Sequence, residues 1–483
     1  MTARTGAEYR AGLRDDRAVW LGDERVDPAT DPRLAGSVTG MAEYFDYQYD
    51  HADDCLMEDA ETGELVNVSH IIPRSPEDLA RRHRALDRLA RYSVGMLGRT
   101  PDYVNVTLAG FAAQRHIFER NGDTRAGEAI VAYQREVALG DRALTHTIIN
   151  PVIDKSKGDL EGINGELPFR VVRRTKDSII VSGSKILGTL GPFADDNFVY
   201  PAHPLPPGSD PAFALCFAAP VGAKGVHTVL RDHYGLDVPR ADQPFSSRFD
   251  EQDAFLIFDE VEVPMEHVFI DGDLQIYADL MKHGWNDNIL QQTSIRAAVK
   301  LEFAWSLATE VAKVQNCADK PEVSQQLGEL AMYAALTRAA ITAAETNARV
   351  WGSGAYFCDA APLMALKSIM PTWMVRAGEI LKQLGSHNLL CTPSAAAFEQ
   401  PELGPLLRRY LPGANGVSPE ERARIFRTAW DFAGSALGGR VELYERFYLA
   451  SAPRNLSRLH SVFDTAKTFG DPYREFLEVS GLG

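Results

Sequence analysis

The 483 residues include 66 acidic and 50 basic side chains, a formal net charge of -16, and 45% of them are hydrophobic. Such an acidic globular surface repels phosphate backbones, which argues against nucleic acid as a partner. The sequence contains no membrane-spanning apolar stretch and no secretory signal core, and its five scattered cysteines lack a CxxC pair, so we expect a cytoplasmic protein.

The N-terminal part, residues 5–141, is predicted to be mainly helical. One helix should begin at Ser75 and Pro76, because a capping serine, a proline in the first turn and two following acids all favour a helix start. An acidic stretch, residues 43–64, is expected to form a loop or a solvated face. No motif in it indicates a function.

Within this part, Arg99 and Tyr103 stand four residues apart. If a helix begins at Pro101, this spacing turns both side chains toward one pocket. The same residues also fit an ordinary helix start with surface charges. From this segment alone both interpretations stay open.

A second polar segment lies where the helical part gives way to strands. His146 stands there among apolar residues, and Thr147, Asn150, Asp154 and Lys155 follow it. A lone histidine in such a place is more often a core residue with satisfied polar atoms. However, ligand clefts form at domain junctions, so a site is the competing interpretation.

Residues 168–270 change to short segments rich in β-branched and aromatic side chains, which are typical of strands. Strands are predicted at residues 178–182, 213–218 and 254–258. A proline-rich loop, residues 204–211, separates two of them. The pattern indicates a compact β-domain between two helical parts.

The C-terminal part is predicted to hold four long helices, at residues 289–315, 322–348, 362–387 and 418–450. Pro371 should kink or break the third helix, and Ser418 should cap the fourth. Long amphipathic helices in succession favour an antiparallel bundle.

Three glycines interrupt the last of these helices just before Arg440. Each costs about 1 kcal/mol in a helix relative to alanine, so Gly438 and Gly439 need a reason. Close helix packing is one explanation. Backbone approach to a diphosphate, with Arg440 as its counter-charge, is another, and the residues do not decide between them.

Together these elements predict an α+β, mainly α chain with the element order of the acyl-CoA dehydrogenase fold. The expected parts are an N-terminal helical domain (residues 1–144), a central β-barrel-like domain (145–272) and a C-terminal four-helix bundle (273–483). No Walker A loop and no GxGxxG between a strand and a helix is present, so we expect no nicotinamide site.

Several segments, in order, resemble the large, FAD-utilising component of 4-hydroxyphenylacetate 3-monooxygenase and its relatives. The similarity runs nearly end to end, and these residues carry it: 5–9, 13–15, 17–20, 22–26, 98–103, 144–147 with Asn150 and Pro151, 255–261, 429–431 and 438–446.

This resemblance implies a monooxygenase that uses reduced FAD and molecular oxygen to hydroxylate a phenol ortho to its hydroxyl group, through a flavin C4a-hydroperoxide. Arg99, Tyr103 and His146 are the implied catalytic trio around the phenolic oxygen. A free phenol has a pKa near 10, so His146 is expected to accept or share its proton. Arg99 would stabilise the phenolate or peroxide oxygen.

The resemblance also implies cofactor contacts and a lid. The flavin contacts are His146, Thr147, Asn150, Asp154, Lys155, Thr189, Gly438, Gly439 and Arg440. Thr189 departs from the family pattern around it. The loop at residues 204–211, with Gly208 and Ser209, is the expected lid over the substrate, and no metal is expected.

A separate NAD(P)H-dependent reductase is the implied source of reduced flavin, and the apolar faces of the bundle favour a dimer or tetramer. The phenol is left open as 4-hydroxyphenylacetate, tyrosine, a carrier-tethered tyrosyl unit or a chlorophenol. Three alternatives remain: a 4-hydroxybutyryl-CoA dehydratase-like lyase, which needs several cysteine ligands for its cluster; an acyl-CoA dehydrogenase-like enzyme with Glu302, Glu310 or Glu379 as base; and a flavin-binding protein without oxygenase activity.

Overall fold

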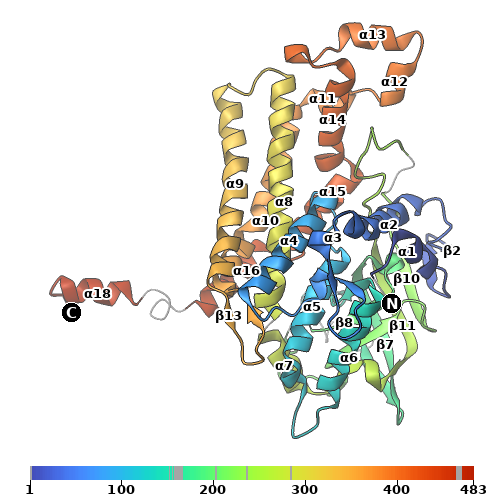
Figure 1. The fold of residues 1–483 in the computed structure, drawn as a ribbon, viewed down its shortest axis with the longest axis vertical. Helices are drawn as coiled ribbons and strands as arrows, with labels where there is room; N and C mark the ends of the chain where they lie inside the picture. The colour runs from blue at the N-terminus through green and yellow to red at the C-terminus, as the bar shows by residue number, and fades with distance from the viewer. Residues whose placement is uncertain are drawn as a thin grey trace.

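Three groups of elements follow one another along the chain in the predicted order (Figure 1). In Figure 1 the long C-terminal helices stand beside one another, and the sheet and the N-terminal helices lie against their lower ends. The computed structural model describes these residues: 3–151, 153, 154, 156, 167–201, 204–234, 238–282, 285–463 and 470–482.

The N-terminal elements are mainly helices, as predicted. They are α1 (Gly6–Gly12), α2 (Ala35–Asp50), α3 (Ala52–Cys55), β3 (Leu56–Glu58), β4 (Leu65–Asn67), α4 (Pro76–Tyr92), α5 (Pro101–Ala113) and α6 (Arg125–Gly140). Ser75 caps α4 as predicted, because its hydroxyl oxygen accepts a hydrogen bond from the Asp78 N–H at 3.1 Å. Helix α5 begins directly after Arg99 and Thr100, so Tyr103 lies in its first turn.

The prediction of a loop or solvated face for residues 43–64 is wrong for the first half of that stretch. Helix α2 continues through it and buries Tyr44, Phe45 and Gln48. Aromatic and acidic side chains alternate there on an amphipathic helix, so a stretch rich in acids still has a buried face. The longest exposed run in this stretch is the turn at residues 60–63.

One large sheet forms the central part. Its strands are β1 (Ala18–Leu21), β2 (Glu24–Val26), β5 (Leu144–Thr147), β6 (Arg170–Arg174), β7 (Ser178–Thr189), β8 (Asp196–Val199), β9 (Leu215–Pro220), β10 (Val226–Leu230), β11 (Asp253–Pro264) and β12 (Val268–Asp271). They are ordered β12-β9-β8-β5-β7-β11-β10-β1-β2, with β6 also paired to β7. In the middle of the sheet, His146 of β5 is opposite Thr189 of β7 and Phe198 of β8.

The three predicted strands correspond to β7, β9 and β11, and β7 and β11 run well beyond the predicted bounds. Strands β1 and β2 come from the part predicted to be mainly helical. They join the edge of the sheet because β1 pairs in parallel with β10. Both strands are too short to show a clear alternation of apolar and polar residues in the sequence. The three domain boundaries stay a prediction.

The C-terminal part is helical, apart from the small β13 (Arg349–Val350) and β14 (Tyr356–Phe357). Its helices are α7 (Leu274–Lys282), α8 (Trp285–Val314), α9 (Pro321–Thr346), α10 (Ala360–Gly385), α11 (His387–Cys391), α12 (Ala395–Glu399), α13 (Leu403–Tyr410), α14 (Pro419–Ala433), α15 (Ala436–Phe447), α16 (Ala452–Val462) and α18 (Pro472–Val479). Helices α8, α9, α10, α14 and α15 share one apolar core. None of the described helices is long and apolar enough to span a membrane.

Helix α10 continues through Pro371, so the break predicted there as an alternative to a kink does not occur. A proline lacks the N–H that would donate to the carbonyl four residues earlier, here Lys367. The side-chain amide of Asn455, from α16, donates to that carbonyl instead, at 3.3 Å. The contact replaces the lost hydrogen bond and ties α16 to α10.

The predicted fourth helix, residues 418–450, is wrong as one element, since it divides into α14 and α15. Ser418 caps α14 as predicted, accepting from the Glu421 N–H at 3.1 Å. Gly434 ends α14, and Ser435 caps α15 by accepting from the Gly438 N–H at 2.9 Å. The glycines therefore lie at a helix boundary and in a first turn, where they cost less than inside a helix.

Candidate active site

Two cavities of about 340 Å³ each meet where β5, the start of α5 and helices α15 and α16 come together. The first is lined by Tyr103 and by residues of α10 and α16, and the second by Arg99 and by residues of β7 and α15. The residues that line both are His146, Ile148, Ile149, Phe447 and Tyr448. The predicted trio Arg99, Tyr103 and His146 therefore meets at one junction.

Arg99 is buried among aromatic rings. Its guanidinium carbon lies 3.9 Å from the ring centre of Tyr103, 5.5 Å from that of Tyr444 and 5.1 Å from that of Tyr448. Its Nη1 atom is buried and has no hydrogen-bond partner among the described residues. A buried cation with an unused donor is costly, so this atom is suited to an anionic or strongly accepting ligand.

The position of Arg99 depends on its neighbours in the chain and in space. Its backbone N–H donates to the buried Glu251 carboxylate at 2.5 Å. Gly98 precedes it, and a Cβ atom at Gly98 would lie 2.4 Å from the ring of Tyr444. Only glycine lets α15 approach this closely, and that approach closes the second cavity.

His146 lies at the centre of the junction. Its Nδ1 is hydrogen-bonded to the Tyr200 hydroxyl group, and its ring meets that of Tyr103 edge-on at 5.3 Å between centres. Burial, together with the nearby Arg99 cation, holds the pKa of His146 well below its usual range. The imidazole is therefore neutral at neutral pH and can accept a hydrogen bond.

In the second cavity Thr189 and Arg440 meet at Asp253. The Thr189 hydroxyl donates to Asp253 Oδ1 at 2.9 Å, and Arg440 donates to both Asp253 oxygens, at 2.8 and 2.5 Å. Arg440 also donates to Glu251 at 2.7 Å. Two carboxylates therefore already offset Arg440, which was expected as a counter-charge for a diphosphate.

The first cavity has the opposite charge balance. Lys367, Arg454 and Arg458 line it, and none of its described lining residues is acidic. Burial and the two arginines lower the pKa of Lys367 to about 8. In a chain with a net charge of -16, this cavity is a local concentration of positive charge.

The other predicted flavin contacts are spread more widely. Thr147 is buried and lines neither cavity, and Asn150 accepts from the Lys185 ammonium at 2.6 Å beside a smaller cavity. Asp154 accepts from the Ser156 N–H and hydroxyl, at 3.0 and 2.6 Å. Lys155 lies outside the described residues.

Gly438 and Gly439 lie in the first turn of α15, beside the second cavity's Arg440 but not on its described lining. A Cβ at Gly438 would meet the backbone of α14 at 3.0 Å, whereas Gly439 faces open space. In the expected lid, Gly208 lies in an exposed turn and Ser209 is half-buried, with the Ser209 hydroxyl donating to the Pro206 carbonyl at 2.7 Å. Pro204, from the same loop, lines the first cavity.

Sequence reasoning missed several side chains at the junction. Tyr444 and Tyr448 follow Arg440 at intervals of four, so helical spacing along α15 could have shown that all three share a face. The two rings stack at 4.9 Å between centres. No local pattern identifies Tyr200, Asp253 or Lys367, which come from separate elements.

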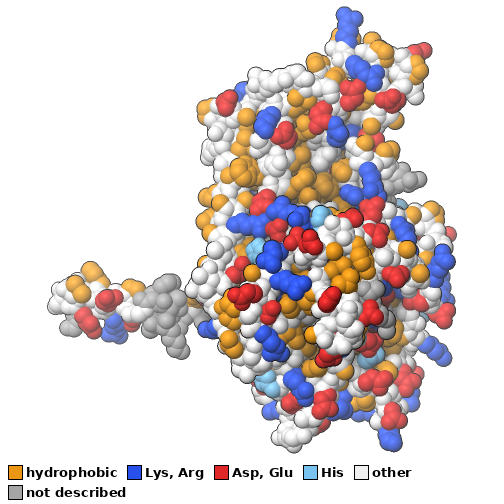
Figure 2. All heavy atoms as spheres, in the orientation of Figure 1, with side chains coloured by type: hydrophobic (Ala, Val, Ile, Leu, Met, Phe, Trp, Pro, Cys, Tyr) orange, Lys and Arg blue, Asp and Glu red, His pale blue; other side chains and the backbone are white. Residues whose placement is uncertain are grey.

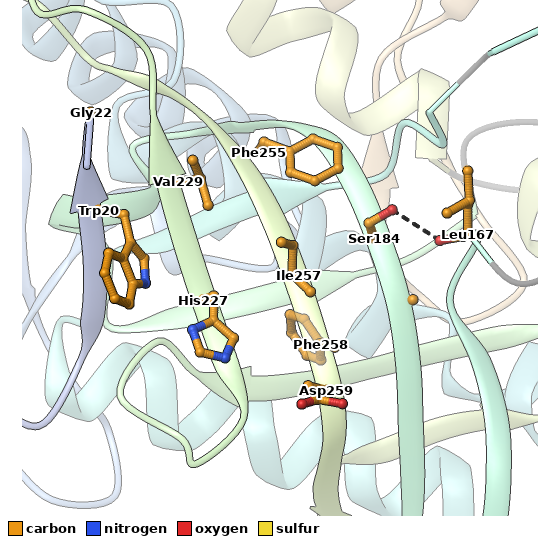
Figure 3. Close-up of a pocket in the computed structure, with 11 residues that line it drawn as sticks. Trp20, Gly22, Leu167, Ser184, His227, Val229, Phe255, Ile257, Phe258 and Asp259 are labelled. Atoms are coloured by element: carbon orange, nitrogen blue, oxygen red, sulfur yellow. Dashed lines mark hydrogen bonds between the residues drawn. The ribbon is translucent and has the colours of Figure 1, made fainter. Parts of the chain in front are cut away.

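A larger hollow of about 740 Å³ lies on the sheet, away from this junction (Figure 3). Figure 3 shows Trp20, His227, Phe255 and Ile257 along neighbouring strands. The hydrogen bond drawn there runs from the Ser184 hydroxyl to a backbone carbonyl, at 3.0 Å. The hollow is mostly apolar and includes none of the predicted catalytic residues, so it is not the candidate site.

The glutamates considered for an acyl-CoA dehydrogenase-like reaction line neither cavity. Each forms an ion pair with a basic side chain instead: Glu302 with Arg338 at 2.6 Å, Glu310 with Lys313 at 2.8 Å, and Glu379 with Arg376 at 2.9 Å. None of these three is placed to act on a ligand at the junction.

Two family patterns match the chain. The pattern "4-hydroxyphenylacetate 3-hydroxylase N terminal" covers residues 5–270, and "4-hydroxyphenylacetate 3-hydroxylase C terminal" covers residues 281–477. Together they span the sheet, the bundle and both sides of the junction.

Individual proteins are also similar to the chain over nearly its whole length. The 4-hydroxyphenylacetate 3-monooxygenase oxygenase component of Thermus thermophilus is 33% identical over 477 residues, 98% of this chain and 96% of its own. A Streptomyces globisporus monooxygenase named for a carrier-protein-bound 3-amino-3-(3-chloro-4-hydroxyphenyl)propanoyl substrate is 30% identical over 98% of this chain and 90% of its own.

Solved structures are similar too. A crystal structure of an HpaB oxygenase component with FAD and 4-hydroxyphenylacetate has a TM-score of 0.93 at 32% identity, with 99% of each chain covered. A 4-hydroxybutyryl-CoA dehydratase from N. maritimus has a TM-score of 0.87 at 21% identity over 100% of this chain and 96% of its own, which shows a shared fold only. The predicted acyl-CoA dehydrogenase-like, mainly α fold is thereby confirmed.

Proposed function

The chain belongs to the 4-hydroxyphenylacetate 3-hydroxylase family, as an FAD-dependent monooxygenase oxygenase component, and we propose that it hydroxylates a phenol ortho to its hydroxyl group. In the net reaction one atom of O₂ enters the ring and the other leaves as water, with two electrons taken from reduced flavin. The observation that carries the proposal is the buried Nη1 of Arg99, which has no partner among the described residues, beside a neutral His146.

The phenol would lie at the junction, with its oxygen at Arg99, Tyr103 and His146. A phenolate is far more nucleophilic at its ortho carbon than a phenol, but a free phenol ionises only near pH ~10. His146, neutral through burial, accepts a hydrogen bond from the phenolic hydroxyl and shares its proton, and the Arg99 cation stabilises the negative charge that develops on the phenolic oxygen. Tyr103 and Tyr200 orient the imidazole and the substrate oxygen.

The second cavity fits a flavin ring. Apolar and aromatic side chains form its walls, and the buried hydroxyls of Tyr444 and Tyr448 have no hydrogen-bond partner among the described residues. When bound and reduced, FAD would supply an electrophilic oxygen atom derived from O₂. Thr189 and Arg440 stay proposed flavin-side residues, with Arg440 acting through Asp253 and Glu251 to hold α15 in place.

The remaining predicted contacts, Thr147, Asn150, Asp154, Lys155, Gly438 and Gly439, also stay part of the proposal. So does the lid formed by the loop of Gly208 and Ser209, whose Pro204 reaches the first cavity. A lid matters because activated oxygen bound to flavin is lost as hydrogen peroxide when water enters.

We further propose that a separate NAD(P)H-dependent reductase supplies the reduced flavin, because relatives are named as oxygenase components and this sequence has no nicotinamide motif. The substrate is a phenol that is either free or carrier-tethered, as relatives of both kinds are known by name. A cytoplasmic location and a dimer or tetramer complete the proposal.

The direct test is to mix the protein anaerobically with reduced FAD and then add O₂ while recording flavin absorbance. A transient C4a-hydroperoxide spectrum that decays faster when a phenol is added, with formation of the catechol, is the expected result. A panel of 4-hydroxyphenylacetate, tyrosine, a chlorophenol and a carrier-bound tyrosyl unit would name the substrate. Oxidation of the flavin at the rate seen without protein would contradict the proposal.

A further inference from the structure

The two ring nitrogens of His146 differ in what they contact. Among the described residues, the His146 side chain makes one hydrogen bond, which joins Nδ1 to the Tyr200 hydroxyl group. Nε2 is left for a ligand in the two cavities that His146 lines. Because the buried imidazole is neutral, only one of its nitrogens carries a proton. The direction of the hydrogen bond at Nδ1 therefore decides whether Nε2 accepts from a ligand or donates to it.

Packing holds the ring of Tyr200 in place, so that only its hydroxyl proton can reorient. Tyr200 directly follows β8 and is buried. Its ring lies 5.6, 5.0 and 5.2 Å, between centres, from those of Phe111, Phe198 and His146. Burial raises the pKa of Tyr200 well above its usual range, so the hydroxyl group keeps its proton. This single proton can be directed to Nδ1 of His146 or away from it.

Thr107 of α5 provides an acceptor on the side away from His146. Its side chain is hydrogen-bonded to the Tyr200 hydroxyl group, and its own hydroxyl donates to the Tyr103 carbonyl at 3.0 Å. A hydroxyl group has one proton to donate and two lone pairs to accept with. With the Thr107 proton given to Tyr103, the Thr107 oxygen accepts the proton of Tyr200. The Tyr200 oxygen is then free to accept from Nδ1 of His146.

We propose that Thr107 and Tyr200 are positioning residues that hold His146 as the tautomer with its proton on Nδ1. Nε2 is then a bare acceptor beside the Arg99 cation. A phenol uses both, since Nε2 accepts a hydrogen bond from its hydroxyl group and Arg99 stabilises the charge that develops on its oxygen. This inference rests on the proposed function and deepens it, because the two residues line neither cavity and act only through His146.

The reversed arrangement is the competing one. Thr107 would donate to Tyr200, and Tyr200 would donate to Nδ1 of His146. The Thr107 proton would then leave the Tyr103 carbonyl, which is the acceptor that a threonine inside a helix commonly uses. Nε2 would carry the imidazole proton and could not accept from a phenol. The two arrangements therefore differ in one observable, the nitrogen of His146 that is protonated.

The test identifies this nitrogen by NMR of the full-length protein labelled with nitrogen-15 histidine, before flavin is added. Protonated and bare imidazole nitrogens differ in chemical shift, and His146→Gln assigns the signals by their loss. We expect the wild-type proton on Nδ1. Thr107→Val removes the acceptor of the Tyr200 proton, which should turn to Nδ1 and move the imidazole proton to Nε2. Thr107→Ser should restore the wild-type tautomer, and Tyr200→Phe, a second variant, should populate both tautomers.

Hydroxylation should follow the tautomer. We expect Thr107→Val to hydroxylate a phenol about 10²-fold more slowly, the lower end of what a positioned proton acceptor contributes, and Thr107→Ser to stay close to wild type. The affinity for reduced FAD should be unchanged in both variants. Thr337→Val is the matched control, because Thr337 is also buried, donates to the Tyr333 carbonyl at 2.8 Å in α9 and lines neither cavity. It should keep the wild-type tautomer and rate.

Three results would overturn the inference. One is a wild-type protein with its His146 proton on Nε2, and another is a Thr107→Val protein that keeps the proton on Nδ1. The third is an equal loss of activity in Thr107→Val and Thr107→Ser, which would show that Thr107 has only a structural role. A wild type with its proton on Nδ1 that hydroxylates no phenol would contradict the proposed function instead and leave the assigned tautomer standing.

Discussion

At the scale of single residues, one physical cause sets the chemistry of the junction. Burial removes water from Arg99 and His146 alike, but with opposite results. Arg99 stays charged because a guanidinium is not deprotonated in proteins, and its Nη1 has no partner in the part of the chain that the structure describes. His146 is made neutral by the same burial and by the Arg99 charge. The pair therefore offers a cation and a neutral hydrogen-bond acceptor to the same ligand atom.

Replacing Arg99 with Gln should lower the kcat/KM of hydroxylation by about 10²- to 10³-fold, the loss seen when one donor to a developing oxyanion is removed. The affinity for reduced FAD should change much less, because the second cavity keeps its tyrosines. Stopped-flow absorbance and product analysis would separate the two effects. Arg446→Gln, at the surface of α15, should leave both unchanged. Equal losses in rate and flavin affinity would argue against a role for Arg99 at the phenol oxygen.

A second buried histidine predicts how stability depends on pH. Burial lowers the pKa of His70 to about 3, and neither ring nitrogen has a partner among the described residues. Below pH ~6.5 the unfolded chain binds a proton that the folded chain does not bind until its own lower pKa. The free energy of unfolding should therefore fall by up to about 1.4 kcal/mol per pH unit in that window.

His70→Leu should remove this contribution, so its stability should decline less steeply than that of wild type as the pH falls. Urea unfolding at several pH values between about 7.5 and 5.5 would measure the slopes. A slope unaffected by His70→Leu would show that this histidine is not a buried neutral group.

The residues that could be predicted from sequence are those that stand in a local pattern. Arg99 and Tyr103 are one helical turn apart, and His146 follows at a visible change of pattern. Tyr200 and Asp253 reach the junction only because β8 and β11 take their places in the sheet. No spacing in the chain encodes those long-range neighbours, so they could not be predicted without the fold.

At the scale of elements, the approach of α15 to the start of α5 depends on one missing side chain. Gly98→Ala would place a Cβ 2.4 Å from the Tyr444 ring, which is itself stacked on Tyr448. We expect a loss of about 1–3 kcal/mol in stability from overpacking and weaker hydroxylation, as the second cavity opens. Gly378→Ala is the control: nothing lies near its Cβ, and alanine should stabilise α10 by up to about 1 kcal/mol. Thermal unfolding and turnover would be compared, and a Gly98→Ala protein as stable and active as wild type would contradict this account.

A buried ion network ties α15 to α8 on the other side. Glu445 accepts from Arg296 at 2.8 and 3.0 Å and from Lys300 at 3.0 Å, and these cations lower its pKa to about 2 despite burial, which raises it. Glu445→Gln would leave two buried cations without a carboxylate, so a loss of about 3–5 kcal/mol is expected. On the same helix, Glu442→Gln removes only surface pairs and should cost less than about 1 kcal/mol. Similar losses in the two variants, measured by urea unfolding, would refute the role of the network.

Helix boundaries were predictable only where side chains mark them. Ser75 and Ser418 carry a cap and a first-turn proline, and both start helices as predicted. At the boundary between α14 and α15, a glycine and a serine interrupt an otherwise helical sequence. The direction in which the chain turns there is set by the buried Asp431, whose carboxylate accepts from the backbone N–H groups of residues 245 and 246. Tertiary contacts of this kind override local helix propensity.

At the scale of the whole molecule, the order of helices, sheet and bundle follows from patterns long enough to read in sequence. The edge of the sheet does not, because β1 joins it by pairing with β10, about 200 residues away in the chain by its numbering, and β2 joins it only through β1. For the bundle, the sequence predicts amphipathic helices, but it does not predict which of their apolar side chains stay exposed.

Exposed apolar side chains on α8 and α9 provide a candidate face for assembly. Met332 and Leu336 are both 48% exposed and lie one turn apart on α9, and Trp305 of α8 is 41% exposed. The two helices form an antiparallel hairpin in which Arg338 pairs with Glu302 at 2.6 Å, so Trp305 lies level with Leu336. Figure 2 shows a separate group of hydrophobic side chains between α8 and α14 on the visible face of the helical half.

If this face joins two copies, a charge placed on it should separate them. We expect sedimentation of wild type as a dimer or tetramer, and of Met332→Glu/Leu336→Glu as a smaller species with its fold retained by circular dichroism. The charge would have to be buried unpaired in the interface, which costs several kcal/mol and far exceeds its effect on a solvated helix face. Val350→Glu, 64% exposed on β13, is the control and should assemble as wild type does. A monomeric wild type would remove the basis for this face as an interface, and an assembled double variant would place the interface on another surface.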